Sequence, residues 1–106
     1  MRIAKVLYKG EEAGIITQND DGSFYFRYDD RWITDDSKPS ISLTLPKSTK
    51  EFSSPVLFAF FYHLLPEGIN KRIVCRTFKI DEDDAFGILL HTSRNDTIGA
   101  VTLERI

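Results

Sequence analysis

The sequence predicts an α+β fold in which a small antiparallel β-sheet, or a partly closed barrel, packs with two or three helices. Segments of alternating hydrophobic and polar residues, separated by turns, occupy the N-terminal part of the chain. Helix-start and helix-stop signals follow in the C-terminal half. With 106 residues, of which 42% are hydrophobic, the chain can build one core, so residues 1–106 are expected to form a single domain.

The first three predicted strands form an antiparallel meander. One face of the first strand, in RIAKVLY, carries Ala4, Val6 and Tyr8. KGEE and then NDDG provide turns, because Asp and Gly tolerate the positive φ of tight hairpins. The glycines expected at turns are Gly10, Gly14 and Gly22. In the third strand, SFYFRY, the residues sharing one face are Phe24, Phe26 and Tyr28.

The middle of the chain predicts a loop followed by one more strand. The segment DDRWITDDSKPS, residues 29–40, is polar and interrupted by Pro39, which indicates a loop pinned by Trp32. The alternating ISLTLP, residues 41–46, is expected to be a short strand that ends at Pro46. Residues 47–52 then lead to the helices.

Three helices are predicted next, and a last strand closes the chain. Ser54 followed by Pro55 is typical of a helix start and Pro66 of a helix end, which favours a helix over 55–65. A second helix, over 67–78, is expected to pack through Ile69, Ile73 and Val74. The acids of DEDD suit the positive end of a third helix in AFGILLH. The β-branched GAVTLERI is expected to pair with the N-terminal sheet.

Charge and composition argue against several classes of partner. The formal net charge is −2 and the pI is about 5.6, so direct binding to nucleic acid or to anionic lipid is not expected. The sequence has neither a signal-peptide core nor an apolar run of ~20 residues, and its single cysteine, Cys75, suits a reducing compartment. A cytoplasmic protein without a membrane segment is therefore expected.

The sequence contains few residues that could support catalysis. The two histidines, His63 and His91, lie outside any nucleophile motif, and Cys75 is not spaced with them as metal ligands are. No glycine-rich phosphate loop is present. We therefore expect no enzymatic activity, no metal and no cofactor. One alternative remains: the aromatic strand FYFRY could stack bases, although its alternation favours a role in the core.

Six motifs in order carry a resemblance to a known family. They are YKGEEAGIIT, DGSFYFRYDDRWI, PSISLTLP, FFYHLLPEGINKRIV, FGILL and DTIGAVTL. Together they resemble the N-terminal subdomain of HipA-type serine/threonine kinases over nearly the whole chain. In that family the subdomain sits on the kinase, whose phosphate-binding and catalytic motifs lie downstream. Family members often carry Gly and Arg before the Asp of the last motif, whereas this chain has Arg94 and Asn95 before Asp96, so no binding role is assigned there.

The resemblance implies an antitoxin. Because the chain stops at Ile106, it is also similar to HipS, the small stand-alone counterpart found in three-component HipBST-type systems beside a HipT kinase and a HipB-type DNA-binding protein. Such a protein would bind and inhibit a HipT- or HipA-like kinase toxin by protein–protein contact, and a HipB-like protein could share the complex. The alternatives are a structural subunit of a split kinase, needed for its fold or activity, and a small nucleic-acid-binding β module.

Helix geometry indicates where a partner could dock. At about 100° per residue, one side of the 55–65 helix carries Leu57, Phe60, Phe61, Leu64 and Leu65. Three residues point the other way: Ala59, Tyr62 and His63. Tyrosine is a favoured interface anchor, and it could equally lie on a loop of its own domain. The candidate partner-binding residues are therefore Tyr62, His63, Ala59, the nearby Glu67, and Trp32 on its loop.

Overall fold

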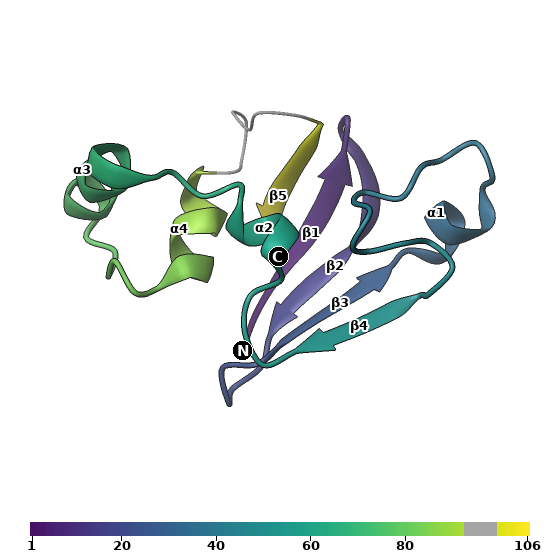
Figure 1. The fold of residues 1–106 in the computed structure, drawn as a ribbon, viewed down its shortest axis with the longest axis horizontal. Helices are drawn as coiled ribbons and strands as arrows, with labels where there is room; N and C mark the ends of the chain where they lie inside the picture. Colours follow the sequence, from purple (N-terminus) through teal and green to yellow (C-terminus); the bar gives the residue numbers. More distant parts are fainter. Residues whose placement is uncertain (93–99) are drawn as a thin grey trace.

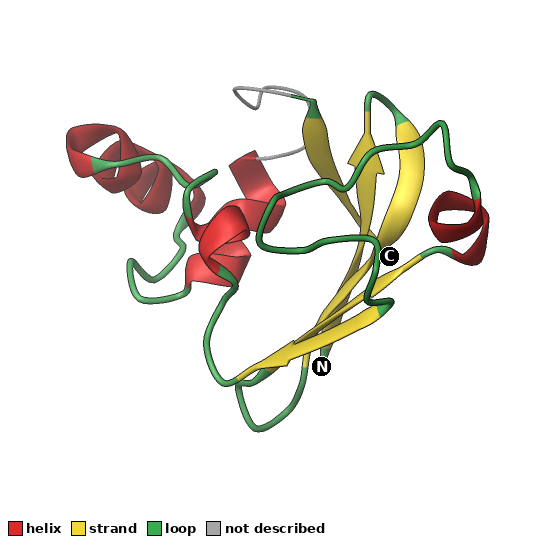
Figure 2. Ribbon diagram, turned by 45° about the vertical axis from the view of Figure 1, so that its right-hand side comes forward, coloured by secondary structure: helices red, strands yellow, loops and turns green. Residues whose placement is uncertain are grey.

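A computed structural model describes residues 1–92 and 100–106. The strands form one open, antiparallel sheet in the order β4-β3-β2-β1-β5, with no closure into a barrel (Figures 1 and 2). Within the described residues, the five strands are β1 (Arg2–Tyr8), β2 (Glu11–Gln18), β3 (Phe24–Tyr28), β4 (Glu51–Ser54) and β5 (Val101–Arg105). The helices in the same residues are α1 (Asp30–Thr34), α2 (Ala59–Tyr62), α3 (Gly68–Phe78) and α4 (Ala85–Thr92). The predicted α+β class is therefore confirmed, as an open sheet.

The predicted meander and its two turns are confirmed. Lys9 and Gly10 both have positive φ, 51° and 83°, and connect β1 to β2 in a tight hairpin, while Gly22 has a φ of 90° in the next turn. Gly14 was wrongly predicted to be a turn glycine, because it lies within β2 opposite Tyr28. A Cβ atom at Gly14 would stand 2.4 Å from the Arg27 carbonyl oxygen, so glycine is required there by close packing of the strands.

The predicted strand over 41–46 is wrong, and the fourth strand is β4. Ile41 and Leu45 are buried, but Leu43 between them is 99% exposed at the tip of a turn closed by the Ser42–Leu45 bridge. The buried Tyr28 hydroxyl holds this turn in place: it donates to the Leu45 carbonyl oxygen and accepts from the Ile41 N–H at 3.1 Å. Burial raises the pKa of Tyr28, which keeps the hydroxyl protonated as a donor.

The loop after β3 is pinned by Trp32, as predicted, and contains the single turn α1. Asp29 caps this helix, its side chain accepting from the Arg31 N–H at 2.9 Å. The Trp32 ring is buried 5.6 Å from the ring of Tyr8, and its Nε1 donates to the Pro39 carbonyl oxygen at 2.8 Å. The loop therefore folds back onto the β1–β2 end of the sheet.

The predicted helix over 55–65 is shorter and begins later. Ser54 does not cap it, because Ser54 pairs with Phe24 in the sheet and keeps the chain extended. Its hydroxyl instead accepts weakly from the Val56 N–H, at 3.3 Å. The chain then crosses the sheet, buries Leu57, and forms only the single turn α2 before Pro66.

The second predicted helix forms as α3, but it does not pack as expected. Ile69 and Ile73 are exposed, Val74 is half-buried as predicted, and Cys75 is buried, although it lies outside the main core cluster. The contacts near its C-terminus explain this rotation. The Phe78 ring lies 3.9 Å from the His91 ring of α4, and the Ile80 N–H donates to the Cys75 carbonyl oxygen at 2.9 Å.

The third helix and the closing strand are confirmed as α4 and β5. Asp84 caps α4 by accepting from the Gly87 N–H at 3.0 Å, and β5 pairs with β1. Arg2 of β1 binds the Asp84 carboxylate at 2.6 Å, which ties the first strand to the start of α4. The Arg2 guanidinium is the main cause of the lowered pKa of Asp84, with the Gly87 N–H assisting and burial opposing.

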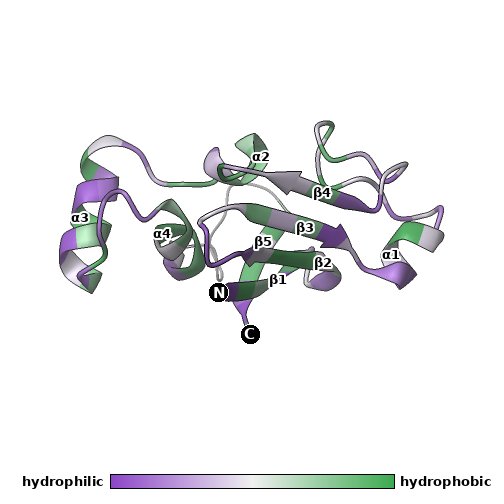
Figure 3. Cartoon of the chain, turned by 90° about the horizontal axis from the view of Figure 1, so that it is seen from below, coloured by the Kyte–Doolittle hydropathy of each residue, from purple (hydrophilic) through white to green (hydrophobic). Residues whose placement is uncertain are grey.

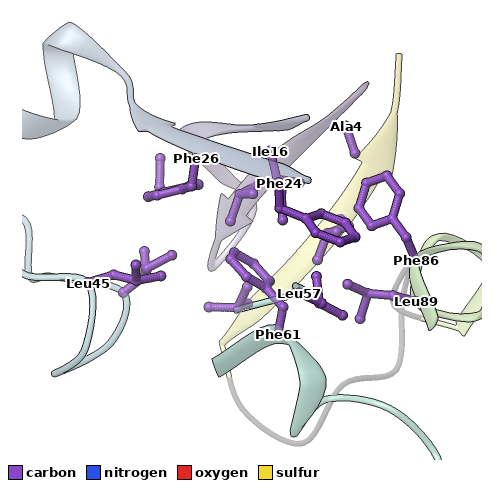
Figure 4. Close-up of a cluster of buried hydrophobic side chains, with 14 of the residues drawn as sticks. Ala4, Ile16, Phe24, Phe26, Leu45, Leu57, Phe61, Phe86 and Leu89 are labelled. Carbon is purple, nitrogen blue, oxygen red and sulfur yellow. The ribbon is translucent and has the colours of Figure 1, made fainter. Parts of the chain in front are cut away.

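The core lies between one face of the sheet and the layer formed by α2 and α4 (Figure 4). The sheet contributes Ile16, Phe24 and Phe26, which point toward the side chains of the covering layer. The two helices contribute Phe61, Phe86 and Leu89, and the segment just before α2 adds Leu57. All three aromatic residues predicted for the inner face of β3 are therefore buried.

Replacing Tyr28 with Phe should remove the hydroxyl that links the two ends of the 41–45 turn, leaving the Ile41 N–H and the Leu45 carbonyl without that partner. We expect a loss of about 1–3 kcal/mol in the free energy of unfolding, measured by urea denaturation. Tyr25→Phe is the matched control, because Tyr25 donates to Glu51 on the outer face and should cost about 1 kcal/mol or less. Equal losses in the two variants would contradict this account.

Candidate partner-binding surface

The single turn α2 presents two opposite faces. Phe61 is fully buried, whereas Ala59, Tyr62 and His63 are exposed, Tyr62 to 56%. The predicted outward orientation of these three residues is confirmed. Exposure alone does not make them a binding site, so their binding role stays a prediction.

Aromatic packing fixes the orientation of α2. The Phe61 ring lies 5.9 Å from Phe26 of the sheet, 5.1 Å from Phe60 and 6.3 Å from Phe58, measured between ring centroids. Two backbone hydrogen bonds of 3.0 Å, from Tyr62 to Phe58 and from His63 to Ala59, complete the turn. Tyr62 and His63 are therefore presented by a backbone that the core holds in place, which lowers the entropy lost on binding.

A groove of about 420 Å³ borders Tyr62. Apolar residues from three segments line it, namely Phe24, Val56, Leu57 and Phe86, together with Asp83 and Asp84 at the start of α4. Sequence reasoning missed Val56, which is exposed, because it was assigned to a helix; its exposure follows from the extended crossing after β4. An aromatic or aliphatic side chain from a partner could fill this groove beside Tyr62.

The two acids of the groove differ in what they can offer a partner. Asp84 is bound by Arg2 and the Gly87 N–H, so its carboxylate already has strong partners. Asp83 is exposed, and its backbone N–H donates to the Asp81 carboxylate at 2.8 Å. The Asp83 carboxylate thus makes the mouth of the groove favourable for a cationic group.

The remaining predicted site residues lie apart from this groove. Glu67 is exposed at the start of α3, five positions beyond Tyr62. Trp32 lies within α1, at the opposite end of the molecule from α3 (Figure 1). Because its ring is buried, Trp32 could affect binding only through the loop that it anchors. Arg94, Asn95 and Asp96 lie outside the described residues.

The described part of the surface offers little for base stacking, metal binding or membrane insertion. Of the β3 aromatics, Phe24, Phe26 and Tyr28 are buried, so Tyr25 alone remains on the outer face for stacking bases. Within residues 1–92 and 100–106, no group of three or more His, Cys, Asp or Glu side chains could hold a metal ion. None of the described helices has the length and hydrophobicity needed to cross a membrane.

Comparison with known proteins identifies the family. A family model of the HipA N-terminal domain matches residues 4–104, so the chain belongs to the HipA N-terminal domain family. A solved structure, "N-terminal domain of HipA toxin", superposes with a TM-score of 0.74 at 30% identity, covering 100% of this chain and 93% of the other. The predicted resemblance and fold are confirmed.

Two relatives differ greatly in length. An uncharacterized protein of Haemophilus influenzae is 34% identical over 104 residues, and the match covers 98% of this chain and 92% of that protein. "Putative kinase Y4mE" of Sinorhizobium fredii is 29% identical over 103 residues, which is 97% of this chain but only 24% of that protein. The same domain therefore occurs both as nearly the whole of a short protein and as about a quarter of a longer one.

Alanine substitutions at Tyr62 and at its buried neighbour Phe61 should have very different effects on stability, because the first side chain is exposed and the second is in the core. Tyr62→Ala removes an exposed ring and should change the free energy of unfolding by no more than about 0.5 kcal/mol. Phe61→Ala leaves a cavity under α2 and should cost about 3–5 kcal/mol. Thermal and urea unfolding of the two variants measure this contrast. A Tyr62→Ala protein that melts as early as Phe61→Ala would place Tyr62 in the core.

Proposed function

We propose that this chain is an antitoxin that binds and inhibits a HipT- or HipA-like serine/threonine kinase toxin by protein–protein contact. The observation that carries the proposal is the match of a HipA N-terminal domain to nearly the whole chain, residues 4–104. The domain occupies about a quarter of the Sinorhizobium fredii protein, whose name is that of a kinase. A domain that accompanies a kinase in one chain is well suited to bind a kinase when supplied on a separate chain.

The short Haemophilus influenzae relative supports a domain that acts on a kinase from a separate chain. Nearly all of that protein is this domain, so the fold can be encoded without an attached kinase body. A separate chain can associate with and dissociate from the kinase, and its concentration then sets the fraction of kinase occupied. That dependence on concentration is what an antitoxin requires.

The chain would inhibit the kinase by binding to it, without catalysing a reaction of its own. Among the described residues, the structure offers no metal cluster, and its two histidines, His63 on the surface and His91 against Phe78, have no nucleophile arranged beside them. A protein of this kind can restrain a kinase only by binding one conformation better than another, or by covering a site. We assign no enzymatic activity to the chain.

The α2 surface is the region we favour for kinase contact. Tyr62 stands beside an apolar groove on a turn held by Phe61, which combines a large amphipathic ring with a fixed backbone. His63 and Ala59 extend the same exposed face, and Glu67 follows on the way into α3. The complex would form in the cytoplasm, where a HipB-like DNA-binding protein could join it.

Co-expression with a HipT- or HipA-like kinase, taken from the neighbouring reading frame if that frame encodes one, tests the proposal. The kinase alone should arrest growth, and the parent chain should restore it. Tyr62→Ala should rescue growth poorly while accumulating to the parent level, since loss of an interface anchor costs about 2 kcal/mol or more in binding. Lys5→Ala is a control on the outer sheet face and should rescue fully.

Two results would contradict the proposal in different ways. If the kinase is harmless alone and becomes toxic or active only with this chain, the chain is a structural subunit of a split kinase. If the kinase is toxic and the parent chain neither binds it nor restores growth, the antitoxin function is wrong.

A further inference from the structure

α3 leaves two of its three branched aliphatic side chains, those of Ile69 and Ile73, in solvent. Ile69 and Ile73, one helical turn apart, are 71% and 55% exposed. Cys75 alone is buried within this fully described helix. Figure 1 shows α3 at one end of the molecule, beyond α4 and away from the sheet, and Figure 3 shows hydrophobic and hydrophilic residues alternating along it. An amphipathic helix normally buries its apolar face, so the orientation of α3 leaves that face available to a partner.

The orientation of α3 is fixed by its C-terminal end. The Phe78 ring packs on His91 of α4, and Lys79 ends the helix in the left-handed conformation, with a φ of 54°. The N–H groups of Lys79 and Ile80 both donate to the Cys75 carbonyl oxygen. The two hydrogen bonds close the end of the helix, and the Phe78–His91 contact turns that side of α3 toward α4. The face with the two isoleucines, on the other side of the helix, then points outward.

The exposed side of α3 is positively charged although the chain as a whole is acidic. Every charged residue from Gly68 to Lys79 is basic: Lys71, Arg72, Arg76 and Lys79. None of the ion pairs found among the described residues involves any of these four. A hollow of about 410 Å³ runs along this side, lined by Ile69, Arg72, Ile73, Arg76 and Thr77. We refer to these five residues as the α3 face.

We propose that the α3 face is a second docking surface for the kinase, and that it binds an apolar groove with carboxylates along one flank. This inference rests on the proposed function. The isoleucines form one row and the arginines an adjacent row, each spaced by four residues, so a single groove can meet both. The apolar floor would bury the isoleucines, and the carboxylates would accept bidentate hydrogen bonds from the guanidinium groups.

The chemistry of the α3 face favours a protein over other occupants. Nucleic-acid phosphates could pair with Arg72 and Arg76 but would leave both isoleucines exposed, and the net charge of −2 opposes binding to a polyanion. An anionic membrane requires a broader apolar face than two isoleucines on an 11-residue helix provide. In a second copy of the chain, the apolar groove beside Tyr62 has one exposed acid, Asp83, for the two arginines of the α3 face. The more acidic hollow around Trp32 is also lined by two cations, Arg31 and Lys38, which makes it a weaker match.

The test uses the full chain and the same HipT- or HipA-like kinase as in the co-expression experiment, with affinity measured by calorimetry. Ile73→Ser removes half of the apolar row and Arg72→Glu reverses one charge, and each should weaken binding at least ~tenfold. Arg105→Glu is the matched control, because it makes the same charge change at an exposed position of β5 and should alter affinity less than about twofold. Since Ile73 and Arg72 are exposed, both variants should keep the parent melting temperature.

The possible outcomes separate this inference from the proposed function. If the parent binds the kinase and both α3 variants bind equally well, the α3 face is not a docking surface and the antitoxin proposal stands. If the parent does not bind the kinase, both proposals fail. Concentration-dependent dimers of the free chain that Ile73→Ser abolishes would assign the face to a second copy. Retention by labelled duplex DNA or anionic vesicles that Arg72→Glu abolishes would also overturn the inference.

Discussion

The burial of Phe61 against the sheet is the contact on which the functional surface depends. α2 is a single turn, too short to be stable alone, and it exists because the Phe61 ring packs among Phe26, Phe58 and Phe60. With Phe61 inward, Tyr62 and His63, about 100° and 200° further around the turn, face solvent. The exposure of Tyr62 and His63 is therefore a consequence of core packing, and so is the apolar groove between Tyr62 and Phe86.

With Phe61 buried, the molecule has one packed side and two helical surfaces, on α2 and α3, that face outward. The sheet buries one face under α2 and α4, with the 41–45 turn held over it by Tyr28. The chain leaving α2 then carries α3 outward, where only Cys75 is buried within the helix. A partner that contacts both α2 and α3 would meet one acidic, aromatic surface and one basic, aliphatic surface, and such a mixed pattern supplies specificity as well as affinity.

The sequence was most informative where local chemistry and periodicity agree. The alternation in β3 and the Lys9–Gly10 turn predicted the meander, and the acids before α4 predicted its capped start, completed by Asp84. The prediction failed where a long-range contact decides the local structure. ISLTLP alternates like a strand, yet the Tyr28 hydroxyl bends it into a turn, and Ser54 resembles a helix cap but pairs with Phe24. Likewise the exposure of Tyr62 could be predicted from helical spacing, but the outward rotation of Ile69 could not, because it depends on distant contacts of α3.

Hydrogen exchange of this chain with and without the kinase tests the central claim most directly, because it reports which backbone amides a partner covers. The account predicts that excess kinase slows exchange in residues 59–63 and along Gly68–Phe78, while the outer edge of β5 exchanges at its original rate. Slowed exchange confined to β5 or to the 41–45 turn, with α2 and α3 unchanged in a formed complex, would contradict it.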